Sequence, residues 1–224
     1  KIAVLCVFAA FLAAAFLIPR EFIESAEASS GGPPPGFSGA PDENNCAACH
    51  LGPSNNGQFA ILDAPVTYSP GQNYQLRVRH VNADTTRKRW GFQMTVLAGQ
   101  TAAGEFINTS TNTQVVLDNG RSYVQHTSAG TFAGQTGGAE WTISWNAPAA
   151  SVGPISLYAA GNQANQGTGP DGDQLYTASV TMLAPRPTAV ANSCPFIMKS
   201  PSPASATTLR SGWRSAAATA AGGP

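Results

Sequence analysis

Residues 74–80 read Tyr74-Gln75-Leu76-Arg77-Val78-Arg79-His80. Apolar and polar side chains alternate along this stretch, so the even-numbered residues, including His80, share one face and the two arginines share the other. A period of two is typical of a β-strand that is buried on one face. Residues 90–96 and 141–145 repeat the alternation with tryptophans on the apolar face. The three segments therefore predict β-strands.

Shorter strand patterns and turn sequences extend this prediction over residues 58–185. Strands are also expected at 59–67, 105–108, 114–118, 122–127, 152–160 and 175–183. Turn sequences separate them at 69–71, 118–120, 136–138 and 169–172. Many short strands with turns at intervals of roughly 8 to 15 residues favour two packed antiparallel sheets. We predict an all-β domain with the architecture of an antiparallel β-sandwich.

The charge balance of the chain excludes some classes of partner. Charged residues are 11% of the sequence, with 12 Lys+Arg against 12 Asp+Glu. This balance gives no electrostatic basis for binding nucleic acid or an anionic membrane surface. The local basic run at 87–89 is interpreted as a solvated hairpin turn. We therefore predict that the chain does not bind nucleic acid.

Residues 1–28 are interpreted as a signal peptide. Lys1 precedes a nearly unbroken apolar run at 2–18, and Ala26 and Ala28 supply the small residues of a cleavage site. An uncleaved anchor is the alternative, because the run approaches the length that spans a bilayer. Either interpretation predicts an exported protein that is periplasmic, on the cell surface or extracellular.

Two segments flank the predicted sandwich at 58–185. Residues 29–57 form a Gly/Pro-rich lead with a polar loop, and the lead has too few apolar residues to fold alone. Residues 186–224 are rich in Ala, Ser and Pro without a sustained period, which predicts a disordered tail. Cys194 lies in this tail and is interpreted as a stray thiol, while Cys6 lies in the signal peptide. A disulfide framework is therefore not expected.

The polar loop of the lead carries the chemistry. Residues 46–50 read Cys46-Ala47-Ala48-Cys49-His50, the CxxCH signature of covalent c-type haem attachment. The two thiols add to the haem vinyl groups, and the adjoining histidine is placed to ligate the iron. We predict one covalent haem c held by Cys46, Cys49 and His50. A zinc site or a Cys46–Cys49 disulfide is the alternative for this segment.

The sandwich offers three candidates for a second iron ligand. His126 is the first choice, because it lies between turn sequences where a side chain can project toward a docked lead. A surface histidine hydrogen-bonded to a loop is an equal alternative for it. His80 is the second, although its strand phase also fits a buried histidine with a backbone partner. Met94 is in phase with Trp90 and Phe92, so core packing explains it better. Two histidine ligands would favour electron transfer at a lower potential than His/Met ligation.

Other chemistry has little support. A Gly-rich loop gathers four residues with oxygen-bearing side chains that could ligate calcium: Asn162, Asn165, Asp171 and Asp173. Their spacing matches no defined calcium loop, and these residue types are also the usual occupants of turns. The sequence contains no nucleophile elbow, paired-carboxylate motif or phosphate-binding loop. We therefore expect an electron carrier and not an enzyme, with calcium as a minor alternative.

A series of short motifs resembles a known bacterial family. They are Gly36-Phe37-Ser38-Gly39-Ala40-Pro41, the CxxCH, Tyr68-Ser69-Pro70-Gly71, Trp90-Gly91-Phe92-Gln93, Tyr123-Val124-Gln125-His126-Thr127, residues 141–148 and residues 157–162. In this order they resemble the exported choice-of-anchor V domain, which is itself similar to the Reeler β-sandwich domain. The resemblance covers about residues 36–183 and implies an immunoglobulin-like sandwich fixed to the cell by a variable C-terminal device. No sorting motif or second apolar span follows Leu183, so the mode of anchoring stays open.

Two hypotheses for function follow. The first is an exported monohaem c-type cytochrome domain for extracytoplasmic electron transfer. Its partners would be a redox protein or a neighbouring haem chain, and cell-surface association or homo-oligomerisation is compatible with it. The second is a cell-surface adhesion or matrix-interaction sandwich in which the CxxCH segment is structural. Fold alone does not decide between them.

Overall fold

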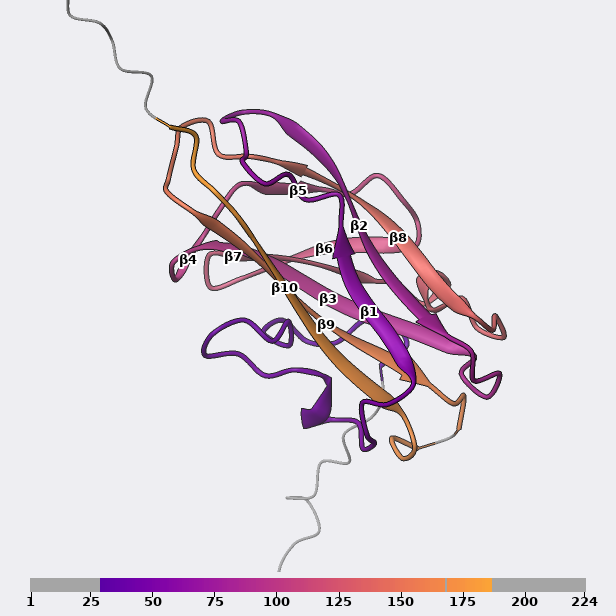
Figure 1. Cartoon of the computed structure of the whole chain (residues 1–224). Coiled ribbons are helices and arrows are strands. Elements are labelled where there is room, and N and C mark those ends of the chain that lie inside the picture. Colours follow the sequence, from indigo (N-terminus) through magenta and orange to yellow (C-terminus); the bar gives the residue numbers. More distant parts are fainter. Residues whose placement is uncertain (1–28, 168, 187–224) are drawn as a thin grey trace, which may run out of the picture. The chain divides into compact units, whose positions relative to one another are not determined.

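The computed structural model describes residues 29–167 and 169–186 (Figure 1). The predicted signal peptide lies outside these residues, as does the predicted tail except for Arg186. Within the described part of the chain, no helix is long and apolar enough to cross a membrane. Ten strands and two short 3₁₀ helices make up the secondary structure of this part: η2 (Cys46–Ala48), β1 (Gly57–Leu62), β2 (Asn73–Asn82), β3 (Arg89–Ala98), β4 (Thr101–Ala102), β5 (Glu105–Ile107), β6 (Thr113–Asp118), β7 (Arg121–His126), η3 (Ala129–Thr131), β8 (Gly138–Asn146), β9 (Ile155–Ala164) and β10 (Gln174–Met182).

The strands form two antiparallel sheets. One has the order β1-β2-β8-β5, and the other has the order β10-β9-β3-β7-β6 with β4 paired to the end of β3. Long registers join the central pairs, for example Asn73 to Asn146 and Val81 to Gly138 at the two ends of the β2–β8 pairing. The predicted all-β antiparallel sandwich is confirmed.

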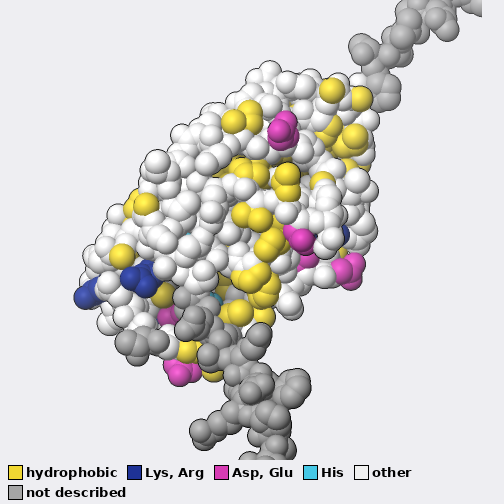
Figure 2. Space-filling view, turned by 180° about the vertical axis from the view of Figure 1, so that it is seen from behind, with side chains coloured by type: hydrophobic (Ala, Val, Ile, Leu, Met, Phe, Trp, Pro, Cys, Tyr) yellow, Lys and Arg dark blue, Asp and Glu magenta, His cyan; other side chains and the backbone are white. Residues whose placement is uncertain are grey.

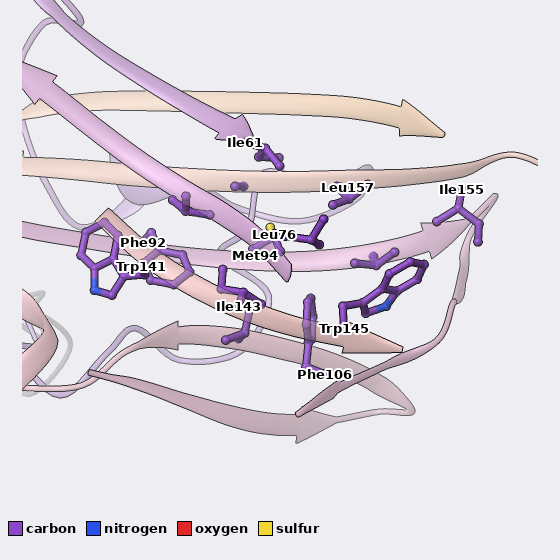
Figure 3. Packing of buried hydrophobic residues seen from close by; sticks show 14 of the residues in the cluster. Ile61, Leu76, Phe92, Met94, Phe106, Trp141, Ile143, Trp145, Ile155 and Leu157 are labelled. Carbon is purple, nitrogen blue, oxygen red and sulfur yellow. The ribbon is translucent and has the colours of Figure 1, made fainter. Parts of the chain in front are cut away.

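The core fills the space between the sheets (Figure 3). Trp90, Phe92 and Met94 alternate along β3 and are each no more than 1% exposed, which the period of two predicts. They pack with Trp141 and other side chains of the facing sheet. Burying one such side chain contributes about 1.5–3 kcal/mol. Met94 is therefore a core residue, as its strand phase indicates.

Local turn chemistry explains where strand boundaries differ from the sequence prediction. The β6–β7 hairpin closes at Asn119 and Gly120, with φ of 46° and 77°, as its Asp-Asn-Gly sequence predicts. The first strand was expected to run to 67 but ends at Leu62, because Asp63 adopts a φ of 63° and leaves the extended conformation. The two-residue strand β4 is too short to leave a periodic signal in the sequence.

The lead lies against the outer face of the six-stranded sheet and forms an additional layer there (Figure 1). Gln93 points to this face, since it alternates with the core residues of β3. Its side chain accepts a hydrogen bond from the Phe37 backbone N–H at 2.6 Å and donates one to the Pro34 carbonyl at 2.8 Å. Polar contacts of this kind explain how a segment poor in apolar residues becomes ordered on the sandwich.

A buried carboxylate fixes the next part of the lead. Glu43 accepts hydrogen bonds from Ser38 Oγ at 2.6 Å, Tyr123 Oη at 2.7 Å and Arg121 Nη1 at 2.6 Å. Desolvation favours the neutral acid, but the bonds from these three partners lower the pKa of Glu43 below its usual value. Glu43 therefore stays ionised and ties the lead to β7.

Candidate functional site

A pocket lies between the lead and the outer face of the six-stranded sheet. The lead contributes Phe37, Cys46, Cys49 and His50 to its wall, and β7 contributes His126. The remaining wall comes mainly from the start of β3 and from the end of β9 with the loop that follows it. The pocket thus gathers the CxxCH segment and the first-choice histidine.

The CxxCH segment folds as one tight turn. The Asn45 side chain caps η2 by accepting a hydrogen bond from the Ala47 N–H at 2.8 Å. The His50 N–H donates a hydrogen bond to the Cys46 carbonyl at 2.9 Å and closes the turn. Both cysteines and His50 therefore line the same pocket. Both cysteines are free thiols. Desolvation raises the pKa of the Cys46 thiol to about 12, so this sulfur remains protonated at neutral pH.

The imidazole of His50 is fixed by residues from β9 and from the loop before β10. Its Nδ1 lies 2.6 Å from a carboxylate oxygen of Asp173, which is 2% exposed. The Asn162 amide nitrogen lies 3.0 Å from the same carboxylate oxygen, 3.0 Å from Nδ1 and 3.3 Å from Nε2. A metal at Nε2 would replace only this last and weakest contact. The arrangement matches a ligating histidine whose other nitrogen is held by a carboxylate.

Close backbone approach brings His50 and Asp173 together. Leu51 and Asp171 form a parallel bridge, and the Asp173 N–H donates to the Leu51 carbonyl at 3.2 Å. A Cβ added at Gly52 would lie 1.6 Å from the Asp173 carbonyl oxygen. Only glycine fits there, and this explains the glycine two positions after His50.

His126 lies at the end of β7, and its ring is held against β3. Its Nδ1 is 3.0 Å from both the backbone nitrogen and the carbonyl oxygen of Phe92, so a metal would bind at Nε2 in place of the Ser29 backbone. Burial lowers the pKa of His126, while backbone hydrogen bonds to Phe92 and Ser29 oppose that effect and the nearby His50 adds to it. His126 is therefore neutral at physiological pH, the form that binds metals.

The ring of His126 needs the glycine beside it. A Cβ added at Gly91 would come within 2.8 Å of His126 Cε1. A glycine inside a strand often marks such a close approach. In the sequence, this glycine stands between two core aromatic residues, Trp90 and Phe92. A prediction of ligands from residue type alone does not include it.

His80, the second-choice ligand, does not line the pocket. It is 1% exposed in the core, where its Nε2 contacts the Gly91 carbonyl and its Nδ1 contacts the Gln163 amide, both at 3.0 Å. Phe59 packs on its ring with centroids 4.5 Å apart. Burial lowers the pKa of His80 to about 3. Both ring nitrogens are engaged, so the structure favours the interpretation of His80 as a buried histidine with a backbone partner.

Two polar atoms at the pocket lack a partner. Among the described residues, the buried side-chain atoms without a hydrogen bond are Arg89 Nε and Asn162 Oδ1, and both residues line this pocket. Buried polar atoms are rarely left unpaired, so they indicate that a further group belongs here. The basic run at 87–89 is thus not wholly a solvated turn, because Arg89 faces the pocket.

These residues fit a c-type haem. The site offers two thiols in CxxCH spacing, one histidine from the lead and one from β7, the ring of Phe37, and a cation without a counter-ion. Haem was predicted from the CxxCH spacing, the adjoining histidine and the exported context. The positions of Asp173, Arg89 and Gly91 add what the sequence analysis missed.

The alternative metals fit less well. In the described ranges, no group of three or more His, Cys, Asp or Glu side chains is placed to hold a metal ion directly. The proposed calcium loop uses its oxygens internally: Asp173 Oδ1 accepts from the Asn165 N–H at 3.1 Å, and the Asp171 carbonyl accepts from the Asn165 amide at 3.0 Å. The carboxylate of Asp173 therefore contacts the imidazole of His50 and does not face an open loop that could bind a cation.

Comparison with known proteins concerns the fold. No family model and no curated protein matches the chain, so membership of the choice-of-anchor V family stays a prediction. Among solved structures, the human F-spondin reeler domain is similar at 19% identity and a TM-score of 0.40, covering 61% of this chain and 94% of that one. The Reelin-N domain of F-spondin gives 20% identity and a TM-score of 0.40, with 61% and 91% covered. The seventh ScaB type I cohesin from Pseudobacteroides cellulosolvens is similar at 14% identity and a TM-score of 0.39. The match covers 59% of this chain and 95% of that one.

Proposed function

We propose that this chain is an exported monohaem c-type cytochrome domain that carries single electrons outside the cytoplasm. The observation that carries the proposal is the pocket in which Cys46, Cys49 and His50 of the lead meet His126 of β7. The CxxCH spacing gives the attachment chemistry, and the sandwich supplies the opposite wall. When bound, a haem supplies one reversible electron at its iron.

Each pocket residue has a defined part in this proposal. The thiols of Cys46 and Cys49 would hold the haem through thioether bonds. His50 would offer Nε2 to the iron, because Asp173 holds its Nδ1. His126 would offer Nε2 as the second ligand, because the Phe92 backbone holds its Nδ1.

The surroundings of these ligands suit electron transfer. Phe37 lines the pocket from the lead, and Trp90 and Phe92 support its β3 wall with their side chains in the core. With His126 as a second ligand, a haem iron would have no open position for a substrate. One face of the domain carries a band of hydrophobic side chains with few charges (Figure 2). We propose a redox protein or a neighbouring haem chain as partner, at the cell surface or in the periplasm.

The visible spectrum tests the proposal. The protein is expressed with its leader in a host that has a haem-attachment system, purified, reduced and extracted with acid acetone. The expected result is a c-type α band that stays with the protein, and that is lost in a Cys46→Ala, Cys49→Ala double variant. A folded wild-type protein without haem, with a Cys46–Cys49 disulfide or bound zinc, would overturn it and favour the adhesion module.

A further inference from the structure

Arg89 carries an unpaired positive charge at the pocket. Its Nε is buried without a hydrogen-bond partner, and no described residue forms an ion pair with its guanidinium. Its neighbour Arg87 differs, since it pairs with Asp84 at 3.2 Å. The expected hairpin turn at 87–89 is instead a connection between the two sheets, since β2 and β3 do not pair. Its two arginines have different surroundings, and only Arg89 lines the pocket.

The pocket offers Arg89 no carboxylate of its own. Asp173 is the one acidic side chain among the described residues that line it. Its Oδ2 is taken by His50 at 2.6 Å and by Asn162 at 3.0 Å, and its Oδ1 by the Asn165 N–H at 3.1 Å. The free Asn162 Oδ1 does not accept from Arg89 either. A buried guanidinium N–H without an acceptor is costly, and an anionic occupant of the pocket is the partner that fits it.

The position of Arg89 on β3 places its side chain on the pocket side of the sheet. Arg89 and Gly91 lie on the outer face of the sheet, since they alternate with the core residues Trp90 and Phe92. Arg89 pairs across the ladder with Ala164, and Gly91 pairs with Asn162, so only small or polar side chains stand beside it. The guanidinium is the cation that best matches a carboxylate, because its planar fork can donate two parallel hydrogen bonds.

We propose that Arg89 binds a propionate carboxylate of the haem that Cys46 and Cys49 hold. This inference rests on the proposed function and deepens it, because it assigns the residue that orients the polar edge of the cofactor. An ionised carboxylate beside Arg89 accepts a hydrogen bond from the unpaired Nε. It also neutralises Arg89, which is the one Lys or Arg among the described residues that line the pocket. The pair also raises the reduction potential relative to an unpaired carboxylate, since less negative charge remains beside the iron.

Three variants test the proposal on the haem-loaded protein. Arg89→Gln removes the cation, and Arg89→Lys keeps the charge but loses the fork. Lys88→Gln is the matched control, because Lys88 is the exposed neighbour of Arg89 and does not line the pocket. The readouts are the propionate bending band in the resonance Raman spectrum and the midpoint potential from a redox titration.

In Arg89→Gln the propionate band is expected to shift, and the ferrous-to-ferric ratio at a fixed potential falls about tenfold, or about 59 mV for one electron. Arg89→Lys gives a smaller change in both, and Lys88→Gln changes neither because its charge is screened by solvent. Arg89→Gln protein that carries covalent haem with an unchanged band and potential would overturn the inference and leave the cytochrome proposal standing. Absence of covalent haem from the wild type would remove both.

Discussion

His50 Nδ1 lies 2.6 Å from the carboxylate of Asp173, although 123 positions separate the two residues in the sequence. The contact joins the lead to the loop before β10, and Asn162 of β9 completes it with a 3.0 Å bond to the same carboxylate oxygen. A carboxylate at this nitrogen makes the imidazole a stronger electron donor at Nε2. The pair therefore fixes the orientation of His50, and under the cytochrome proposal it would also tune the potential of the haem.

Replacing Asp173 by Asn is expected to raise the midpoint potential of the haem-loaded protein. The neutral amide withdraws the negative charge that stabilises the ferric state, and a tenfold change in the redox equilibrium equals about 59 mV. A potentiometric titration measures the change. Asp171→Asn is the control, because Asp171 is exposed and contributes its backbone carbonyl rather than its carboxylate to the loop. Equal potentials in wild type and Asp173→Asn would contradict the assigned role.

His126→Ala is expected to convert a low-spin haem spectrum into a high-spin one. The substitution removes the second nitrogen ligand and leaves His50 alone on the iron. Absorption and electron paramagnetic resonance spectra of the ferric protein report the spin state. His80→Ala serves as the comparison, since His80 lies in the core and is expected to lower stability without changing the spin state. A high-spin spectrum from His80→Ala alone would reverse the two assignments.

Gly91→Ala is expected to displace His126 without altering the ligand itself. The added methyl group would stand 2.8 Å from His126 Cε1, closer than carbon atoms approach without a shift. The ferric spectrum should therefore gain a high-spin fraction. Gly31→Ala is the matched control, because a Cβ there meets nothing nearer than 3.9 Å. A fully low-spin Gly91→Ala protein would show that His126 does not ligate the iron from this position.

Glu43→Gln is expected to loosen the lead from the sheet. The amide leaves Arg121 without its counter-ion and weakens the bonds from Ser38 and Tyr123, at a cost of about 2–4 kcal/mol. Hydrogen exchange should become faster at the lead amides around residues 36–46 than in β2 and β8. Asp63→Asn breaks an exposed ion pair with Arg77 and is expected to leave the protection of the lead unchanged. Equal protection of the lead in wild type and Glu43→Gln would contradict the proposed attachment.

The stability of the sandwich is expected to fall as the pH drops below about 6.5. His80 has a pKa of about 3 in the folded protein, so the unfolded chain binds a proton in this range that the native protein does not. The free energy of unfolding then decreases with falling pH down to about pH 3, by a few kcal/mol at most. Urea denaturation at several pH values measures the slope. His80→Gln should flatten it, and an unchanged slope would show that another group controls the acid transition.

The sequence predicts the sandwich well because its signals are local. Alternation along 74–80 and 90–96 decides which side chains are buried, and the Asp-Asn-Gly turn at 118–120 closes a hairpin by its own backbone preferences. The missing part of strand 59–67 depends on one residue, Asp63, with a positive φ. The haem-attachment motif is local too, since five consecutive residues carry it.

The wall of the pocket opposite the CxxCH segment could not be predicted in the same way. It exists because the lead folds back on the sheet through contacts such as Phe37 to Gln93, which are 56 positions apart. Asp173 therefore suggested a calcium loop, and Arg89 suggested a solvated turn. Only the paired registers of β3 and β9 bring Arg89, Gly91 and Asn162 together beneath His50 and His126.

Peptide mass spectrometry of the exported protein tests the central claim most directly. The protein is produced with a haem-attachment system, digested, and the peptide that contains residues 46–50 is isolated. We predict that this peptide carries one haem bound through both Cys46 and Cys49. The same peptide without haem, with its two cysteines as free thiols or joined in a disulfide, would contradict the account.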